Sequence, residues 1–551
     1  MSHSMRTFFR ALLTVPLVGS ALTASAFVPI PAMAQDVATA QDAASAAKID
    51  PPLLDALSTG PPARVIILGR TQLFAPVGGL EDFQLAHATD HRLELRDQVV
   101  ATLKENAAAE QERILRALGR READRALWIL NALSLELSPE EIRTASRLDD
   151  VLFIYAGGER PRSPTVPAEP VLVLPDAETP PFSTSGKDIA WNVRHLNAPR
   201  VWSELGNVGQ GAVVAVLDNG ANYAHTDLRA NLWRNAGEVP NNGIDDDDNG
   251  WVDDVYGYDV SGMSPDVGNT RTDRQHGTMT SGIVLGDGTS GIVTGVAPRA
   301  RLMLLKLTGD NVDSAGDRPI AAALAYQYAI ENGADILSMS FSLPNLGNLR
   351  GLWRMMSDHA VAAGLVLVGG AGNFRTTQPI PVQHQSPKDV PSVISVGGID
   401  TLGVLVPFSS MGPAEWSSVA LYGDYPMPEG IMKPDLVAFP GAGFPVLGIE
   451  DSGYIDTDEI RIRGNSFSGP QVAGIAALIL SEHPSMSVWR VREVIERSAH
   501  DLGAPGKDNM FGFGLADAYA ALMMVRGGSS TPSPPPNRQA PGFQRVPIPG
   551  G

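Results

Sequence analysis

Three residues in the chain have the types and the surroundings that nucleophilic catalysis by a serine requires. Asp218 ends the apolar run in AVLDNG, His276 begins the small-residue segment HGTMTSGIVLG, and Ser466 lies in RGNSFSGP before a further apolar run. A serine hydroxyl is a weak nucleophile until a neutral imidazole accepts its proton, and a buried carboxylate fixes the tautomer of that imidazole. The three residues therefore predict acyl-transfer chemistry, provided that the fold brings them together.

The residues around Ser466 predict the beginning of a buried helix. Pro470 falls in the first turn of this helix, where the missing N–H of proline costs nothing. Free backbone N–H groups and the positive end of the helix dipole would lie beside the hydroxyl, which suits a developing negative oxygen. Taken alone, Ser466 fits an ordinary helix N-cap better than a nucleophile, so the other motifs decide between the two interpretations.

Asn373 is a further residue that suits this chemistry. It ends the segment GGAGN, which closes an apolar run, and its side-chain amide carries the N–H donors that an oxyanion needs. Loss of such a donor typically lowers turnover by about 10²–10³-fold. Asn373 is therefore the predicted oxyanion donor.

The elements that must position these residues are short strands alternating with helices. Between residues 187 and 525, near-continuous apolar runs recur, as strands do when a sheet is buried on both faces. These runs are GAVVAVLD, RLMLLKL, ADILSMS, LVLVGGAGN and SVISVGG. They predict an α/β domain with a parallel, helix-covered sheet, in which sites form at the carboxyl ends of the strands.

Residues 61–160 predict a separate, small α+β domain. A strand at 63–69 precedes a charged amphipathic helix at 91–118, and two alternating strands then meet near Asn131. The capping-box sequence SPEE opens a second helix, and a strand at 151–157 closes the unit. This order is the split βαβ, or ferredoxin-like, arrangement, which by itself names no function.

The first 34 residues have the pattern of a secretory signal. Arg6 and Arg10 supply the positive start, ALLTVPLVGSAL the apolar centre, and residues 32–34 an A-x-A cleavage site. Pro16 and the small residues disfavour a membrane anchor, and no later run is long and apolar enough to cross a bilayer. The protein is therefore predicted to be secreted, either to the periplasm or outside the cell.

Stretches of biased composition separate the predicted domains. Residues 35–60 predict a flexible lead-in, residues 161–186 an exposed proline-rich linker open to processing, and residues 526–551 a disordered Gly/Pro-rich tail. The folded part that carries the three chemical motifs is thus expected to be 187–525.

Composition excludes several classes of function. The formal net charge of −19 disfavours nucleic acid, because phosphate would be repelled. The chain contains no cysteine, so disulfides, thiol catalysis and zinc–thiolate sites are ruled out, while the redox compartment is left open.

An acidic loop at 241–254 predicts a calcium site. Its expected ligands are Asp245, Asp247, Asn249 and Asp253, in the order D-x-D-x-N-G-x-x-D. Alternate oxygen ligands around the turning glycine, Gly250, suit a hard cation that takes six to eight oxygens. Tyr256 stands where an EF-hand has its closing glutamate, so this is not a complete EF-hand loop. In the calcium hypothesis, the ion braces this segment and takes no part in catalysis. The alternative hypothesis is a solvated acidic loop that binds no ion.

The order Asp, His, Ser and the sequences around these residues resemble the subtilisin-like serine proteases. The similar segments are GQGAVVAVLDNGANYAHTDL, HGTMTSGIVLGDGTSGIVTGVAP, GGAGN, FSSMGP, KPDLVAFPG and GNSFSGPQVAG. The resemblance covers most of 187–525 and implies a serine endopeptidase, in which His276 is general base and then acid. Ser466 would be the nucleophile, Asp218 would orient the histidine, and Asn373 with the backbone N–H of Ser466 would form the oxyanion hole.

The resemblance also implies where substrate binds and how the enzyme matures. The implied substrate-binding residues are Ser340, Phe341, Ser342, Gly370 and Gly372. Residues 61–160 resemble the inhibitory propeptide of the family, which assists folding and is then removed. The chain would thus be a self-processing zymogen whose propeptide is an intramolecular inhibitor.

Four residues depart from the family pattern. Asn219 replaces the usual Thr or Ser after the aspartate, and Asn465 and Phe467 flank the nucleophile where Thr and Met are usual. Ser342 replaces a glycine that borders the main specificity pocket. None removes an atom of the triad, so we expect Asn465 and Ser342 to affect substrate preference more than activity.

Two competing functions follow from the same residues. An α/β-hydrolase esterase would need G-x-S-x-G around the serine and a different residue order, whereas this chain has G-x-S-x-S. A secreted, calcium-binding protein without catalysis is the competitor from another class.

The expected partners are protein or peptide substrates and the chain's own propeptide, with no nucleic acid, no membrane after signal cleavage, and a monomeric state.

Overall fold

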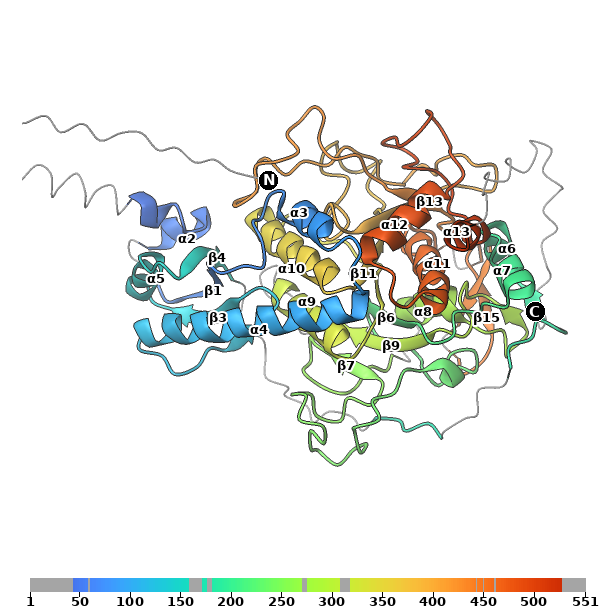
Figure 1. Ribbon diagram of the computed structural model, residues 1–551, viewed down its shortest axis with the longest axis horizontal. Helices are drawn as coiled ribbons and strands as arrows, with labels where there is room; N and C mark the ends of the chain where they lie inside the picture. Colours follow the sequence, from blue (N-terminus) through green and yellow to red (C-terminus); the bar gives the residue numbers. More distant parts are fainter. Residues whose placement is uncertain are drawn as a thin grey trace, which may run out of the picture.

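The computed structural model describes residues 43–57, 60–157, 171–175, 181–269, 275–307, 318–441, 443–448, 450–459 and 462–527. The expected signal sequence, most of the expected linker and nearly all of the expected tail lie outside these residues. Figure 1 shows a smaller body at the left, the amino-terminal domain (43–157), and a larger one, the main domain (181–527). No helix in the described ranges combines the length and the apolar character that a membrane span needs.

The amino-terminal domain is a four-stranded antiparallel sheet with a long helix along it (Figure 1). Its elements are β1 (Ala63–Gly69), α3 (Gly79–Ala86), α4 (Arg92–Ala117), β2 (Arg125–Leu127), β3 (Ala132–Leu137), α5 (Pro139–Ser146) and β4 (Val151–Ala156). The strand order is β2-β3-β1-β4, which is the order of the split βαβ arrangement expected from the sequence. Val65, Ile67 and Leu135 are buried in its core.

The helix α5 begins where its capping sequence predicts. The Ser138 hydroxyl accepts a hydrogen bond from the Glu141 backbone N–H at 3.3 Å, and the Glu141 carboxylate accepts one from the Ser138 N–H at 2.8 Å. Each residue thus satisfies a backbone donor that the first helical turn would leave unpaired.

The segment 43–57 differs from the flexible lead-in that the composition suggests. It contains the helix α2 (Pro51–Ala56), and Ile49 and Leu53 are buried against the amino-terminal domain. The backbone of β4 pairs with this segment, because Ile154 N–H donates to the Lys48 carbonyl at 2.7 Å. Apolar residues among the Ala, Asp and Pro of this stretch therefore hold it in place.

The main domain is built on a seven-stranded parallel sheet, which confirms the predicted α/β fold. The strands are β6 (Val213–Asp218), β7 (Gly257–Asp259), β9 (Arg301–Lys306), β10 (Ile336–Met339), β11 (Val366–Gly370), β12 (Ile394–Gly398) and β13 (Leu436–Ala438). Their order is β13-β12-β11-β10-β6-β9-β7. Every residue of β10, β11 and β12 is buried, as the continuous apolar runs predict.

Two helix pairs cover the central strands. The helices α8 (His276–Leu285) and α11 (Ser468–Glu482) pack against each other, while α9 (Arg318–Glu331) and α10 (Arg350–Ala362) form a second pair beside the amino-terminal domain (Figure 1). The remaining described elements are β5 (Asp188–Ile189), α6 (Trp191–His195), α7 (Ala198–Leu205), η1 (Arg229–Asn231), β8 (Ile292–Val293), η3 (Gly347–Leu349), β14 (Pro445–Leu447), β15 (Tyr454–Asp456), α12 (Val488–Arg497) and α13 (Ala518–Val525). Because β6, β10 and β11 are neighbours and parallel, their carboxyl ends open on one edge of the sheet.

A short stretch of the expected linker, 171–175, lies against the main domain. The backbone N–H of Val171 donates to the Asn241 side chain at 2.8 Å, and those of Leu172 and Leu174 donate to the hydroxyls of Tyr223 and Tyr256 at 3.0 Å each. Asn241 belongs to the acidic loop, so this stretch is held beside that loop.

Two arginines of α4 join the domains. Arg92 is 2% exposed and lies 2.5 Å from the Asp335 carboxylate, while its other nitrogens donate to the carbonyls of Gly364 and Pro484 at 2.9 Å. Arg96 donates to the carbonyls of Ala334 and Ala363 at 2.7 and 3.0 Å. These carbonyls lie just beyond the carboxyl ends of α9 and α10, where the helix dipole favours a cation.

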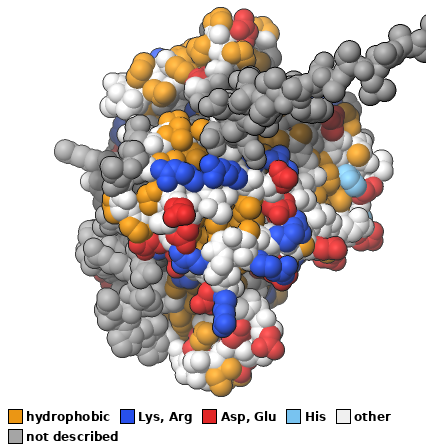
Figure 2. Space-filling view, turned by 90° about the vertical axis from the view of Figure 1, so that its left-hand side faces the viewer, with side chains coloured by type: hydrophobic (Ala, Val, Ile, Leu, Met, Phe, Trp, Pro, Cys, Tyr) orange, Lys and Arg blue, Asp and Glu red, His pale blue; other side chains and the backbone are white. Residues whose placement is uncertain are grey.

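Exposed charges on the amino-terminal domain have both signs. Figure 2 shows basic and acidic side chains interspersed on this face of the molecule. The exposed pairs include Arg120 with Glu141 at 2.6 Å and Arg116 with Glu112. Such surface pairs contribute little to stability, in contrast to Arg92.

We expect Arg92→Ala to weaken the contact between the domains strongly. It leaves the Asp335 carboxylate without its buried partner, and breaking such a pair typically costs about 3–5 kcal/mol. Urea unfolding of the intact chain measures this loss. Arg116→Ala on the same helix is the matched control and should change stability by no more than about 0.5 kcal/mol. Equal effects of the two substitutions would contradict the assignment.

Candidate active site

Asp218 and His276 are brought into direct contact by β6 and α8. Asp218 is the last residue of β6 and is 7% exposed, and His276 is the first residue of α8. The His276 Nδ1 lies 2.8 and 2.9 Å from the two carboxylate oxygens of Asp218. This geometry fixes the imidazole with its Nδ1–H toward the carboxylate and leaves Nε2 as the nitrogen that can accept a proton.

Neighbouring residues hold the carboxylate in place. The Thr280 hydroxyl donates to Asp218 Oδ2 at 3.1 Å, and the Asn219 backbone N–H donates to Oδ1 at 2.8 Å. The side chain of Asn219 accepts from the Gly277 N–H at 2.9 Å and so binds a free donor in the first turn of α8. Asn219, which departs from the family pattern, thus links the segment that carries Asp218 to the helix that begins at His276. The sequence motifs do not indicate the role of Thr280.

The protonation of His276 depends on two opposing effects. Burial lowers the pKa of His276, the Asp218 charge and its hydrogen bond raise it, and the net result is a pKa above the ordinary 6.5. The neutral imidazole, which is the form that accepts a proton, therefore predominates only above this raised value.

Ser466 lies immediately before α11 and is tied to the end of β10. Its hydroxyl donates to the Ser340 carbonyl at 3.1 Å, and the Ser340 hydroxyl donates to the Ser466 carbonyl at 2.8 Å. Within the described ranges Ser466 makes no hydrogen bond to His276. Catalytic hydrogen bonds often tighten only when substrate binds, so a rotation of the hydroxyl is needed to engage Nε2.

Asn373 follows β11 and faces the same turn. Its Oδ1 accepts a hydrogen bond from the Asn465 N–H at 2.9 Å, which leaves the amide N–H groups for another acceptor. A Cβ on Gly464 would meet Asn373 Nδ2 at 2.8 Å, so the glycine makes room for this amide. The amide therefore lies beside the turn that carries Ser466.

The expected substrate-binding residues surround this turn. Ser340, Phe341 and Ser342 follow β10, next to Ser466, while Gly370 is the last residue of β11 and Gly372 lies two residues beyond it. A Cβ on Gly370 would meet the Asn465 carbonyl at 1.9 Å, and Gly372 has a φ of +104°. Both positions therefore require glycine.

The residues that flank Ser466 are buried. Asn465 is 0% exposed and donates to the Gly372 carbonyl at 2.8 Å and the Ser409 hydroxyl at 3.1 Å. It supports the turn that carries Ser466 from inside. Phe467 is 1% exposed, and its ring lies nearly parallel to that of His276 with centroids 6.1 Å apart.

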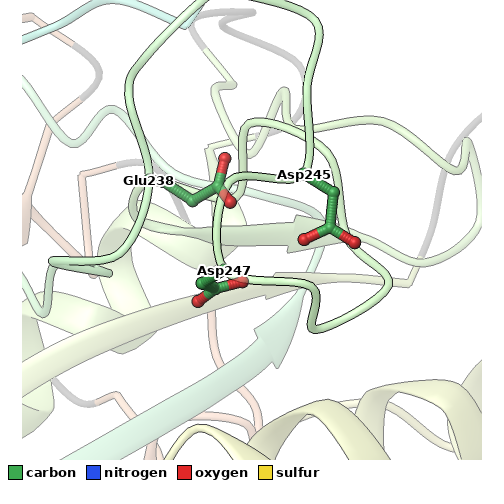
Figure 3. Close-up of side chains that lie close together, drawn as sticks. All are labelled: Glu238, Asp245 and Asp247. Carbon is green, nitrogen blue, oxygen red and sulfur yellow. The ribbon is translucent and has the colours of Figure 1, made fainter.

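The acidic loop gathers three carboxylates, as Figure 3 shows. Ligand atoms of Glu238, Asp245 and Asp247 lie within 4.8 Å of one another. Glu238 is 7% exposed, and its Oε2 has no hydrogen-bond partner in the described part of the chain. Burial raises the pKa of Glu238. Glu238 was not expected from the sequence, because it lies outside the D-x-D-x-N-G repeat and only the fold brings it back to Asp245.

The other two expected ligands lie in different surroundings. Both carboxylate oxygens of Asp253 accept backbone hydrogen bonds, from Asn242 and Gly243 at 3.0 Å each. The Asn249 side chain accepts from Trp251 N–H at 2.8 Å and donates to Asp254. Asp245 also accepts backbone hydrogen bonds, from Asn249 and Gly250 at 3.0 and 2.7 Å, so closeness to Glu238 is what distinguishes Asp245 and Asp247.

Residues 209–514 match the family model described as the subtilase family of peptidases. Several relatives share this similarity. Bacillopeptidase F of Bacillus subtilis is 26% identical over 79% of the chain and 29% of its own length, and the calcium-dependent protease of Trichormus variabilis is 26% identical over 60% and 48%. Subtilisin DY of Bacillus licheniformis is 27% identical over 60% of the chain and 98% of its own length. The chain thus spans less than half of the first two relatives.

We expect Asp218→Asn to lower the pKa of His276. The substitution removes the negative charge that lies 2.8 Å from Nδ1, while the burial that opposes protonation remains. Titration of the imidazole by NMR in an otherwise unchanged chain should show the midpoint moving to lower pH. A midpoint that stays in place or rises would contradict this account of the pair.

Proposed function

The chain belongs to the subtilase family, and we propose that it is a subtilisin-like serine endopeptidase with Asp218, His276 and Ser466 as its triad. The observation that carries the proposal is the contact between Asp218 and His276 Nδ1 at 2.8 Å, at the sheet edge where Ser466 and Asn373 also lie. In an open parallel sheet this edge is the place where a site forms.

The geometry supports the following sequence of steps. The Ser466 hydroxyl turns from the Ser340 carbonyl to His276, which takes its proton as Oγ attacks the carbonyl carbon of the substrate. The developing oxyanion accepts hydrogen bonds from the Asn373 amide and the Ser466 backbone N–H. His276 then protonates the leaving amine, and water hydrolyses the acyl-enzyme with the same groups acting in reverse order.

We propose that the amino-terminal domain is an inhibitory propeptide that the enzyme removes from itself. Its buried contacts at Arg92 and Arg96 support a domain that folds together with the main domain. The cut would fall in the linker that joins the two, and the first 34 residues would direct secretion, to the periplasm or outside the cell. The substrates would be proteins or peptides.

We also propose a structural calcium ion held by Glu238, Asp245 and Asp247. The fit rests on converging carboxylate oxygens and on the buried, unpaired Oε2 of Glu238, which would otherwise carry a desolvation cost. A relative named calcium-dependent protease agrees with this. When bound, calcium would neutralise the carboxylates and brace the loop between Asp218 and His276.

We expect Ser466→Ala to abolish casein hydrolysis and to leave the amino-terminal domain attached. Without the hydroxyl no acyl-enzyme forms, and removal of one triad member leaves only about 10³–10⁴-fold catalysis over water. Casein turnover before and after phenylmethylsulfonyl fluoride, and mass spectrometry of the purified chain, measure the two effects. A purified Ser466→Ala chain that still matures would refute self-processing.

We expect calcium to raise the melting temperature and a chelator to lower it and to speed autolysis. A ligand present at 100 times its dissociation constant stabilises a protein by about 2.7 kcal/mol. Glu238→Gln should reduce this response. The matched control is Asp248→Asn, which removes one charge from an exposed residue of the same loop and should keep the response. A response that Glu238→Gln leaves intact would exclude Glu238 as a ligand.

A further inference from the structure

Lys388 is a fully buried lysine next to the candidate catalytic centre. It is 1% exposed and lies in the loop that leads into β12. Its Nζ lies 5.5 Å from the ring centroid of Phe341. Its aliphatic stem packs against the end of β11. A Cβ on Gly369 would lie only 2.9 and 3.0 Å from Lys388 Cγ and Cδ.

Both contacts place the lysine beside residues that are expected to bind substrate. Phe341 follows Ser340, which exchanges hydrogen bonds with Ser466. Gly369 precedes Gly370, which packs against the turn of Asn465 and Ser466. The charge of Lys388 also acts on His276, where it opposes protonation. The ammonium group is thus enclosed by the same strand ends that border the nucleophile.

The charge of Lys388 has no ion-pair or hydrogen-bond partner among the described residues. The adjacent Asp389 is paired with Arg350 through Oδ2 at 2.8 Å, and its Oδ1 makes no hydrogen bond. A second buried lysine shows the usual solution, because Lys433 lies 2.6 Å from Asp435 and 2.7 Å from the Val393 carbonyl. An ammonium buried without such partners costs several kcal/mol, about the scale given for a desolvated ion.

A substrate carboxylate would supply the missing partner. Under the proposed function, the residue before the scissile bond lies next to Ser466, because its acyl carbon is attacked by Oγ. Its side chain would then lie against the segments that follow β10 and β11. A glutamate or aspartate there would bring its charge to Lys388, and a neutral residue would leave the ammonium unpaired. We propose that Lys388 makes this enzyme cleave after acidic residues, an inference that rests on the proposed function.

The charged groups around Lys388 allow this pairing. Burial lowers the pKa of Lys388 to about 7, and burial lowers that of the neighbouring His384 to about 3, so this histidine is neutral. The charge of the adjacent Asp389 opposes this effect of burial on the pKa of Lys388, although its carboxylate is paired with Arg350. His276 is held by Asp218. A preference for glutamate over glutamine should therefore weaken as the pH rises through about 7 and Lys388 loses its proton.

The experiment compares peptides that differ only in the residue before the cut: glutamate, glutamine or leucine. We expect kcat/KM at pH 6 to be at least about 30-fold higher for glutamate than for glutamine, the scale of a buried charge pair. Lys388→Met keeps the stem but removes the charge and should bring this ratio close to one, while Lys388→Arg should keep a preference for glutamate. Arg375→Met, which removes another cation two residues after Asn373, is the matched control and should keep the ratio.

Active-site labelling by phenylmethylsulfonyl fluoride separates the two levels of failure. If one sample of the enzyme is labelled at Ser466 and an untreated sample cleaves the leucine or glutamine peptide as well as the glutamate peptide, the inference is wrong and the proposed function stands. A Glu-to-Gln ratio unchanged in untreated Lys388→Met also overturns it. If no peptide is cleaved and Ser466 is not labelled, the proposed function fails and this inference falls with it.

Discussion

The close approach of β11 to the turn before α11 is the constraint on which the site depends. A Cβ on Gly370 would lie 1.9 Å from the Asn465 carbonyl, and one on Gly469 would lie 2.7 Å from the Gly370 nitrogen. Two backbones can come this near only where neither carries a side chain. This contact sets the Asn373 amide beside Ser466 and leaves the end of β10 within hydrogen-bond reach of the serine.

The parts of the fold that local pattern determines could be predicted from the sequence. Strands such as β6 and β11 are continuous apolar runs, and the capping box at Ser138 marks the start of α5. The residue order and the ends of these strands indicated Asp218, His276 and Asn373 because neighbouring parallel strands share one edge. The resemblance to the subtilisin-like proteases, which rests on the motifs around these residues, covered most of the main domain. The family match over residues 209–514 confirms this resemblance.

The remaining features depend on how loops and domains fold against one another, which the local pattern does not show. Glu238 joins Asp245 only after the loop folds back, and no spacing reveals that the oxygens of Asp253 accept backbone hydrogen bonds. Lys388 has nothing in its sequence neighbourhood to mark it as buried. Arg92 and Arg96 look like ordinary charges on an amphipathic helix, but the ends of α9 and α10 surround them with carbonyl oxygens.

If the linker is cut as proposed, the position of the cut relative to residues 171–175 would matter for the product. A cut before Val171 would leave this stretch as a new amino terminus that the Asn241, Tyr223 and Tyr256 side chains already bind. Release of the amino-terminal domain would then leave the hydrogen bonds between residues 171–175 and the acidic loop intact. A cut after residue 175 would remove these hydrogen bonds, so the two products would differ in how readily the segments beside Asn241, Tyr223 and Tyr256 open to further digestion.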